Sequence, residues 1–167
     1  PLLNSNKKAL EELEEIENNF AKVMQEKMEK MWANKLGISK FDVELFEELI
    51  NLMIETKVDY TIFFRELSNI PDDISSLEKS FYGSLKNENI KLRWNNWLEK
   101  WKSFINVTDK ESIKSLSNQM KLTNPKYTLR EWHLVKAYKE AQDENYKPIH
   151  ELQEIMTNPY DKQTKEI

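Results

Sequence analysis

Cysteine and glycine are the residues whose scarcity says most about this chain. None of its 167 residues is cysteine, which excludes a disulfide scaffold, a thiolate zinc site and a cysteine nucleophile. Gly37 and Gly83 are the only glycines. Sheet proteins with many tight turns need more glycine, and so do loops that cradle phosphates. The abundant Glu, Lys, Leu, Met and Asn instead predict an all-α fold.

Long apolar runs and an excess of basic residues are also missing. No stretch of about eighteen apolar residues occurs, so the sequence predicts no membrane span. The formal net charge is −4, with both signs mixed along the chain, whereas a general nucleic-acid binder should carry a basic excess. We therefore expect neither nucleic acid nor a membrane among the partners.

The length suits one domain or a piece of a larger protein. We expect a helical domain over residues 1–160 and a loose tail over 161–167, where the apolar periodicity ends. The chain starts without an initiator Met, and its first residues do not form a signal peptide. These features predict a fragment or processed product that is not secreted.

Apolar residues at helical spacing predict seven or eight helices in one irregular bundle. They recur every three or four positions from Leu10 to Met31, which predicts a long first helix. Ser5 or Asn6 would cap this helix, and Gly37 would end it. We interpret its Met-rich side as core or partner packing rather than a metal site, because no partner ligand accompanies it.

Capping residues mark the starts of later helices. Ser39 with Asp42 has the spacing of a capping box, and so does Thr108 with Glu111. Asp59 is the expected cap of another helix.

The clearest apolar stripe lies in the helix after a polar loop at residues 84–89. Its members are Ile90, Trp94, Trp97, Leu98, Trp101, Phe104 and Ile105. Basic residues are interleaved with these tryptophans, a pattern that suits base stacking and phosphate contacts. The tryptophans follow the helical period, however, and the charges take the other face, which favours core packing. A short helix around residues 76–82, closed by Gly83, precedes the loop.

The segment from residue 123 to 132 carries the most information. The sequence predicts a helix there, with Asn124 as its cap and Pro125 in its first turn. The apolar members of this helix would be Leu129, Trp132, Val135 and Tyr138. Arg130 would then lie at the edge of a buried aromatic face.

No residue pattern in the chain names a reaction. The two histidines, His133 and His150, belong to no metal-binding motif. The many carboxylates are mostly spaced three or four positions from lysines, as on a solvated helix face. We therefore name no catalytic, cofactor-binding or metal residue in this chain. By residue patterns alone, the sequence supports a helical domain and no chemistry.

Four short segments occur in an order typical of one known protein family. They are Lys35-Leu36-Gly37, then Asp59-Tyr60-Thr61 with Phe64-Arg65-x-Leu67-Ser68, then Asn124-Pro125-Lys126-Tyr127 with Leu129-Arg130-x-Trp132, and finally Asn158-Pro159-Tyr160. Together they resemble the C-terminal part of the selenoprotein O family of kinase-like protein adenylyltransferases. The third segment is the most specific. The resemblance spans about residues 31–160 and is thin between 72 and 120.

The resemblance implies a function for a larger parent protein. Family members are kinase-like, bind ATP with Mg or Mn, and transfer AMP to protein hydroxyl groups. Their nucleotide and metal residues lie upstream of the region that this chain resembles, and nothing here matches them. The chain would then be a C-terminal helical extension whose partner is the kinase-like catalytic domain. It would lie in the bacterial cytoplasm, or in the mitochondrion of a eukaryote.

We expect five residues of the signature segments to contact that catalytic domain: Arg65, Arg130, Asp59, Asn124 and Trp132. Arginine suits such a junction because its guanidinium makes paired hydrogen bonds to carboxylates or carbonyls. An arginine that braces two helices within this same domain is the alternative. Surface that normally meets the catalytic domain would be exposed in the fragment and could drive artificial oligomers.

Two other functions stay open. A free-standing helical module could bind a partner helix through its aromatic stripes, which a large exposed apolar patch would favour. An independent enzyme would need a pocket with convergent polar groups and shifted pKa values.

Overall fold

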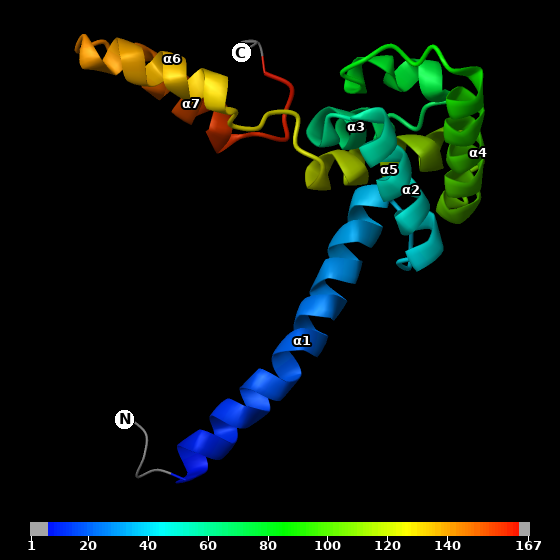
Figure 1. Ribbon diagram of the computed structural model, residues 1–167, viewed down its shortest axis with the longest axis horizontal. Helices are drawn as coiled ribbons and strands as arrows, with labels where there is room; N and C mark the ends of the chain where they lie inside the picture. The colour runs from blue at the N-terminus through cyan, green and yellow to red at the C-terminus, as the bar shows by residue number, and fades with distance from the viewer. Residues whose placement is uncertain (1–6, 164–167) are drawn as a thin grey trace.

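The computed structural model describes residues 7–163, and within them the chain is helical (Figure 1). The elements are α1 (Lys7–Leu36), α2 (Val43–Thr56), α3 (Tyr60–Leu67), the 3-10 helix η1 (Ile74–Ser80), α4 (Glu88–Ile105), α5 (Lys110–Thr123), α6 (Glu131–Gln142) and α7 (Lys147–Thr157). The only extended pairing in the described part is an isolated bridge between Val58 and Phe81. The all-α prediction and the expected number of helices are therefore confirmed.

The core lies between the C-terminal end of α1 and helices α2 to α5. Its largest members are the α4 tryptophans Trp94, Trp97 and Trp101, which are all fully buried. The prediction that the tryptophan stripe packs in the core is therefore confirmed. Trp97 donates a hydrogen bond to the Leu45 carbonyl at 2.9 Å, and Trp101 donates one to the Leu36 carbonyl at 2.7 Å. The tryptophans thereby tie α4 to α2 and to the end of α1.

Short polar side chains cap the starts of α2, α3, η1, α4 and α5, although two of these caps lie elsewhere than expected. Asp59 accepts a hydrogen bond from the Ile62 amide at the start of α3. Asp42, not Ser39, caps α2, and Asp109, not Thr108, caps α5. In both cases the carboxylate nearer the helix accepts the free amides, and it also complements the helix dipole.

Gly37 ends α1 in the left-handed conformation, with φ of +68°. A Cβ at this position would stand 2.6 Å from the Met120 sulfur, so both the backbone conformation and the packing favour glycine. The predicted stop is confirmed.

The short helix predicted over residues 76–82 is shifted. It is the 3-10 helix η1, which begins after Asp73 and ends at Ser80, short of Gly83. Asp73 accepts the Ser75 amide and so moves the start toward the N-terminus.

The prediction that a helix starts at Asn124 is wrong. Residues 124–130 are not helical, and α6 begins only at Glu131. Asn124 instead ends α5, with its amide bonded to the Met120 carbonyl. The amides of Lys126 and Tyr127 bond to the Pro159 carbonyl, which holds this linker extended against the segment after α7.

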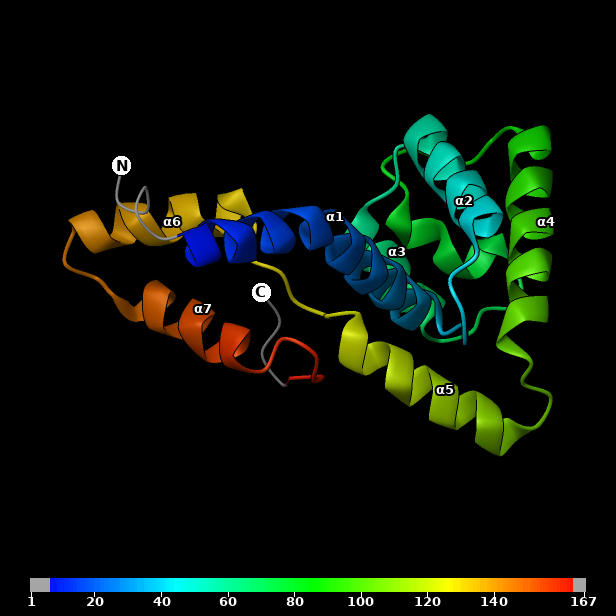
Figure 2. The same ribbon diagram turned by 90° about the horizontal axis from the view of Figure 1, so that it is seen from below.

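Helices α6 and α7 form an antiparallel hairpin that extends away from the bundle (Figures 1 and 2). Ala137 of α6 and Ile155 of α7 are buried. The predicted apolar face is not: Leu129, Trp132, Val135 and Tyr138 are all exposed. Helical spacing identified one face of α6, but that face points away from the rest of the described chain.

Helix α1 extends from the bundle in another direction (Figure 1). Only its C-terminal end, with Ala33 and Leu36, is buried. The predicted caps Ser5 and Asn6 lie outside the described residues, and so do residues 164–167 of the tail that was predicted over 161–167. In residues 7–163, none of the helices combines the length and hydropathy needed to cross a bilayer.

Candidate functional site

Two groups of hydrogen-bonded polar side chains, one around Asp59 and one around Asn124, join α1, α3, α5 and the linker before α6. We call the two groups together the polar junction, and its members are Lys35, Asp59, Arg65, Ser68, Tyr82, Asn124 and Arg130. It contains four of the five residues that the sequence analysis singled out. Lys35, Ser68 and Tyr82 complete it.

Asp59 is the carboxylate of the junction, and it is buried, with 6% of its surface exposed. The Arg130 guanidinium donates two hydrogen bonds to it, at 2.6 and 2.8 Å, and the Tyr82 hydroxyl donates a third at 2.9 Å. The bonds from Arg130 outweigh the desolvation of the carboxylate and lower its pKa to about 2. Asp59 is therefore ionised and serves both as the cap of α3 and as the anchor of Arg130.

Arg130 lies directly before α6 and holds the α6–α7 hairpin to α3. Its bonds to Asp59 raise the pKa of the guanidinium further above its already high value. The same guanidinium lies 5.3 Å from the centre of the Trp132 ring, a cation–π contact. The ring itself is 62% exposed.

Arg65 closes the C-terminal end of α5. It donates hydrogen bonds to the carbonyls of Lys121 and Asn124, at 3.1 and 3.0 Å. A cation at this end of a helix compensates both the free carbonyls and the negative end of the helix dipole. Burial lowers the pKa of Arg65, and its position is that of an arginine bracing two helices.

Asn124 is fully buried and links three helices. Its side-chain amide donates to the Lys35 carbonyl at 2.9 Å and to the Ser68 hydroxyl at 3.1 Å. Its side-chain oxygen accepts a bond from the Lys35 ammonium at 3.1 Å. The Asn124 side chain, which was predicted to cap a following helix, thus bonds to residues of α1 and at the end of α3.

The Lys35 ammonium lies among aromatic rings instead of carboxylates. It stands 5.2 Å from the ring centres of Tyr60 and Phe64, and burial lowers the pKa of this lysine. Burial also raises the pKa of the Tyr60 hydroxyl to about 12. No local sequence pattern pairs Lys35 with Asn124, because the two residues are 89 positions apart.

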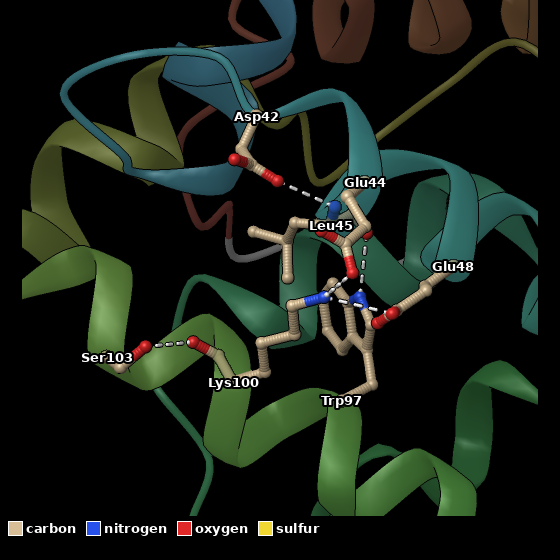
Figure 3. Close-up of polar contacts among 7 residues, drawn as sticks. All are labelled: Asp42, Glu44, Leu45, Glu48, Trp97, Lys100 and Ser103. Carbon is tan, nitrogen blue, oxygen red and sulfur yellow. Dashed lines mark hydrogen bonds and ion pairs between the residues drawn. The ribbon is translucent and has the colours of Figure 1, made fainter.

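A second polar cluster lies on the surface between α2 and α4 (Figure 3). Lys100 donates to Glu44 at 3.1 Å and to Glu48 at 2.9 Å, above the buried bond from Trp97 to Leu45. These carboxylates raise the pKa of Lys100. Exposed pairs of this kind contribute little to stability. Glu48 and Lys100 also line an open pocket, together with Arg93 and Asn96.

The geometry of the polar junction is suited to holding helices together. Its carboxylate, guanidinium and amide groups bond to other groups of this chain, whereas the Trp132 ring faces outward. Contact of these residues with another domain stays a prediction. In residues 7–163 no group of three metal-binding side chains gathers. His133 is half-buried and His150 is exposed, on separate helices.

Comparison with known proteins agrees with the family resemblance of the sequence. A family model described as protein adenylyltransferase SelO matches residues 4–157. The chain belongs to the SelO family. Proteins named protein nucleotidyltransferase YdiU are among its relatives. One from Photobacterium profundum is 33% identical over 162 residues, which cover 90% of this chain. One from Flavobacterium johnsoniae is 31% identical and covers 98% of the chain.

The match to these SelO-family relatives is partial on their side. It covers 31% of the Photobacterium protein and 32% of the Flavobacterium protein. The chain thus spans about a third of the length of the curated relatives that it matches.

Proposed function

We propose that this chain is the C-terminal helical region of a SelO-type protein adenylyltransferase, and that it supports a kinase-like catalytic part outside the chain. The observation that carries the proposal is the match of residues 4–157 to the SelO family, in a chain that spans about a third of its relatives. The parent would transfer AMP from ATP, with Mg or Mn, to hydroxyl groups of proteins. Such a parent would act in the bacterial cytoplasm or in a mitochondrion.

The polar junction supports a structural role for the chain. Asp59 and Asn124 are buried, and their polar atoms bond to groups that lie far away along the sequence. Buried polar groups of this kind fix one relative position of the helices, because any other position leaves them without partners. A rigid helical region could present a constant surface to a catalytic part.

The structural role predicts how a junction variant behaves in a full-length protein. We would build a chimera in which this chain replaces the matching third of the Flavobacterium johnsoniae protein. Arg130→Ala should speed the thermal inactivation of AMP transfer while leaving the KM for ATP unchanged at low temperature. A several-fold change in that KM, with unaltered thermal inactivation, would mean that Arg130 acts on the nucleotide and would refute the structural role.

A free-standing interaction module is the second candidate, favoured by the exposed apolar side chains of α1 and α6. The chimera separates the two functions. A module that works alone should bind its partner equally well as the 167-residue chain and within the chimera. A supporting region should present those surfaces only when the rest of the protein is missing.

A further inference from the structure

Helix α1 carries an apolar stripe that nothing in the described chain covers. Seven large side chains form it, each between 41% and 64% exposed: Leu10, Leu13, Ile16, Phe20, Val23, Met24 and Met28. Single exposed apolar residues are common on proteins, but contiguous apolar patches of more than a few hundred Å² usually mark an interface. We call this set the α1 stripe.

Residues on the side away from the α1 stripe hold most of the C-terminal end of α1 in the bundle. With about 100° of rotation per residue, the members of the stripe fall on one side of the helix, and the buried Ala33 and Leu36 fall on roughly the opposite side. Lys35 falls on the stripe side and reaches the Tyr60 and Phe64 rings at the last turn of α1. The stripe itself, from Leu10 to Met28, is left for another body.

The rest of a full-length SelO-family protein is the best occupant for that face. Two thirds of the length of the matched relatives lie outside this chain. A covalently attached body meets the stripe at an effective concentration in the millimolar range, far above that of a separate molecule such as a second copy. The Met side chains of the stripe adapt readily to an irregular surface.

We propose that the α1 stripe is the surface on which the remaining two thirds of the full-length protein dock. The side chains from Leu10 to Met28 insert into an apolar surface of that part, while the opposite face of the C-terminal end of α1 stays in the helical bundle. Helix α1 is then shared between two bodies and fixes one against the other. Because this inference rests on the proposed function, its test must separate the two.

Hydrogen–deuterium exchange tests the docking directly. We would compare amide exchange in residues 10–28 of the 167-residue chain with exchange in the chimera described above. Docking predicts that these amides exchange at least about tenfold more slowly in the chimera, because a covered helix opens less often. Equal exchange in both proteins would overturn the proposal.

Matched variants show whether the stripe itself is responsible. Ile16→Glu with Phe20→Glu places two charges in the stripe and should abolish the added protection; Phe20→Ala, which adds no charge, should reduce it. Ile54→Glu with Leu122→Glu is the control, because these side chains are 72% and 70% exposed on α2 and α5. Protection that survives the stripe variants, or is lost equally in the control, would also refute the proposal.

Two further measurements show whether the docking surface or the proposed function has failed. AMP transfer by a chimera whose stripe stays unprotected would refute the docking surface and leave the proposed function standing. A protected stripe in a chimera without AMP transfer would support the docking surface and refute the proposed function. Light scattering on the 167-residue chain tests whether a second copy of the chain covers the stripe instead. A dimer that Ile16→Glu dissociates, together with no added protection in the chimera, would assign the stripe to a second copy and refute the proposal.

Discussion

The Arg130 guanidinium and the Asp59 carboxylate form a paired hydrogen bond across 71 residues of sequence, at 2.6 and 2.8 Å. This pair connects the start of α3 to the linker that leads into α6. It is largely buried, since the Arg130 side chain is 22% exposed and that of Asp59 is 6% exposed. The position of the α6–α7 hairpin therefore depends on it.

Arg130→Ala should lower the free energy of unfolding by about 2–4 kcal/mol, because it leaves a buried carboxylate without its main partner. Chemical denaturation of the 167-residue chain measures this change. Arg93→Ala is the matched control: Arg93 bonds to Glu55 at 2.7 Å, but both side chains are nearly half exposed, so the loss should stay below about 1 kcal/mol. Similar losses for the two variants would show that burial of the Asp59 pair has no special weight.

The pH dependence of stability should carry the signature of Asp59. Its pKa is lowered from 3.8 to about 2 in the folded chain, so the folded state favours the ionised form. The resulting stabilisation, roughly 2 kcal/mol, is present above the unfolded pKa and disappears as the pH falls from about 4 to about 2. Denaturation at several pH values should show the wild type losing its advantage over Asp59→Asn in that window. A constant difference down to pH 2 would contradict the lowered pKa.

Asn124→Ala should destabilise the chain by about 2–3 kcal/mol, because it removes the side-chain hydrogen bonds that Asn124 makes to the Lys35 carbonyl and the Lys35 ammonium in the interior. Asn89→Ala serves as the control, since Asn89 is exposed on α4, and its effect should stay within about 0.5 kcal/mol. Equal midpoints of thermal unfolding for the two variants would show that the hydrogen bonds of Asn124 do not stabilise the chain.

Two tryptophans of α4 allow a direct comparison of a bonded and an unbonded indole. Trp101 donates to the Leu36 carbonyl, whereas the Trp94 indole nitrogen has no hydrogen-bond partner within the described residues. Both are fully buried. Trp101→Phe should therefore cost about 1 kcal/mol more than Trp94→Phe in denaturation experiments. An equal or reversed order would mean that the bond to Leu36 adds nothing beyond packing.

The sequence predicted the parts of this fold that local chemistry decides. Asp59 as a cap and Gly37 as a stop each follow from the needs of a helix end. The tryptophan stripe of α4 was assigned to the core because its period matches a helix and its charges take the other face. Local patterns of this kind hold wherever the tertiary structure agrees with them.

Asn124 shows why other features escaped prediction. An Asn-Pro pair suits the start of a helix. In the folded chain, however, the Asn124 side chain donates hydrogen bonds to the Lys35 carbonyl and the Ser68 hydroxyl instead of capping a helix. The Asp59–Arg130 pair has no local signal at all, because only the folded chain brings the two residues together. Helical spacing on α1 and α6 identified apolar faces but could not tell whether this chain or another body covers them.

Transfer of label from α-labelled ATP to a protein acceptor, with Mg or Mn present, tests the central claim most directly. The 167-residue chain and the full-length chimera would be run side by side. We predict labelled acceptor with the chimera and none with the chain alone, because we propose that the chemistry lies in the catalytic part and that this chain supports it. Label transferred by the 167-residue chain alone would contradict the account and would reveal a nucleotide site within these helices.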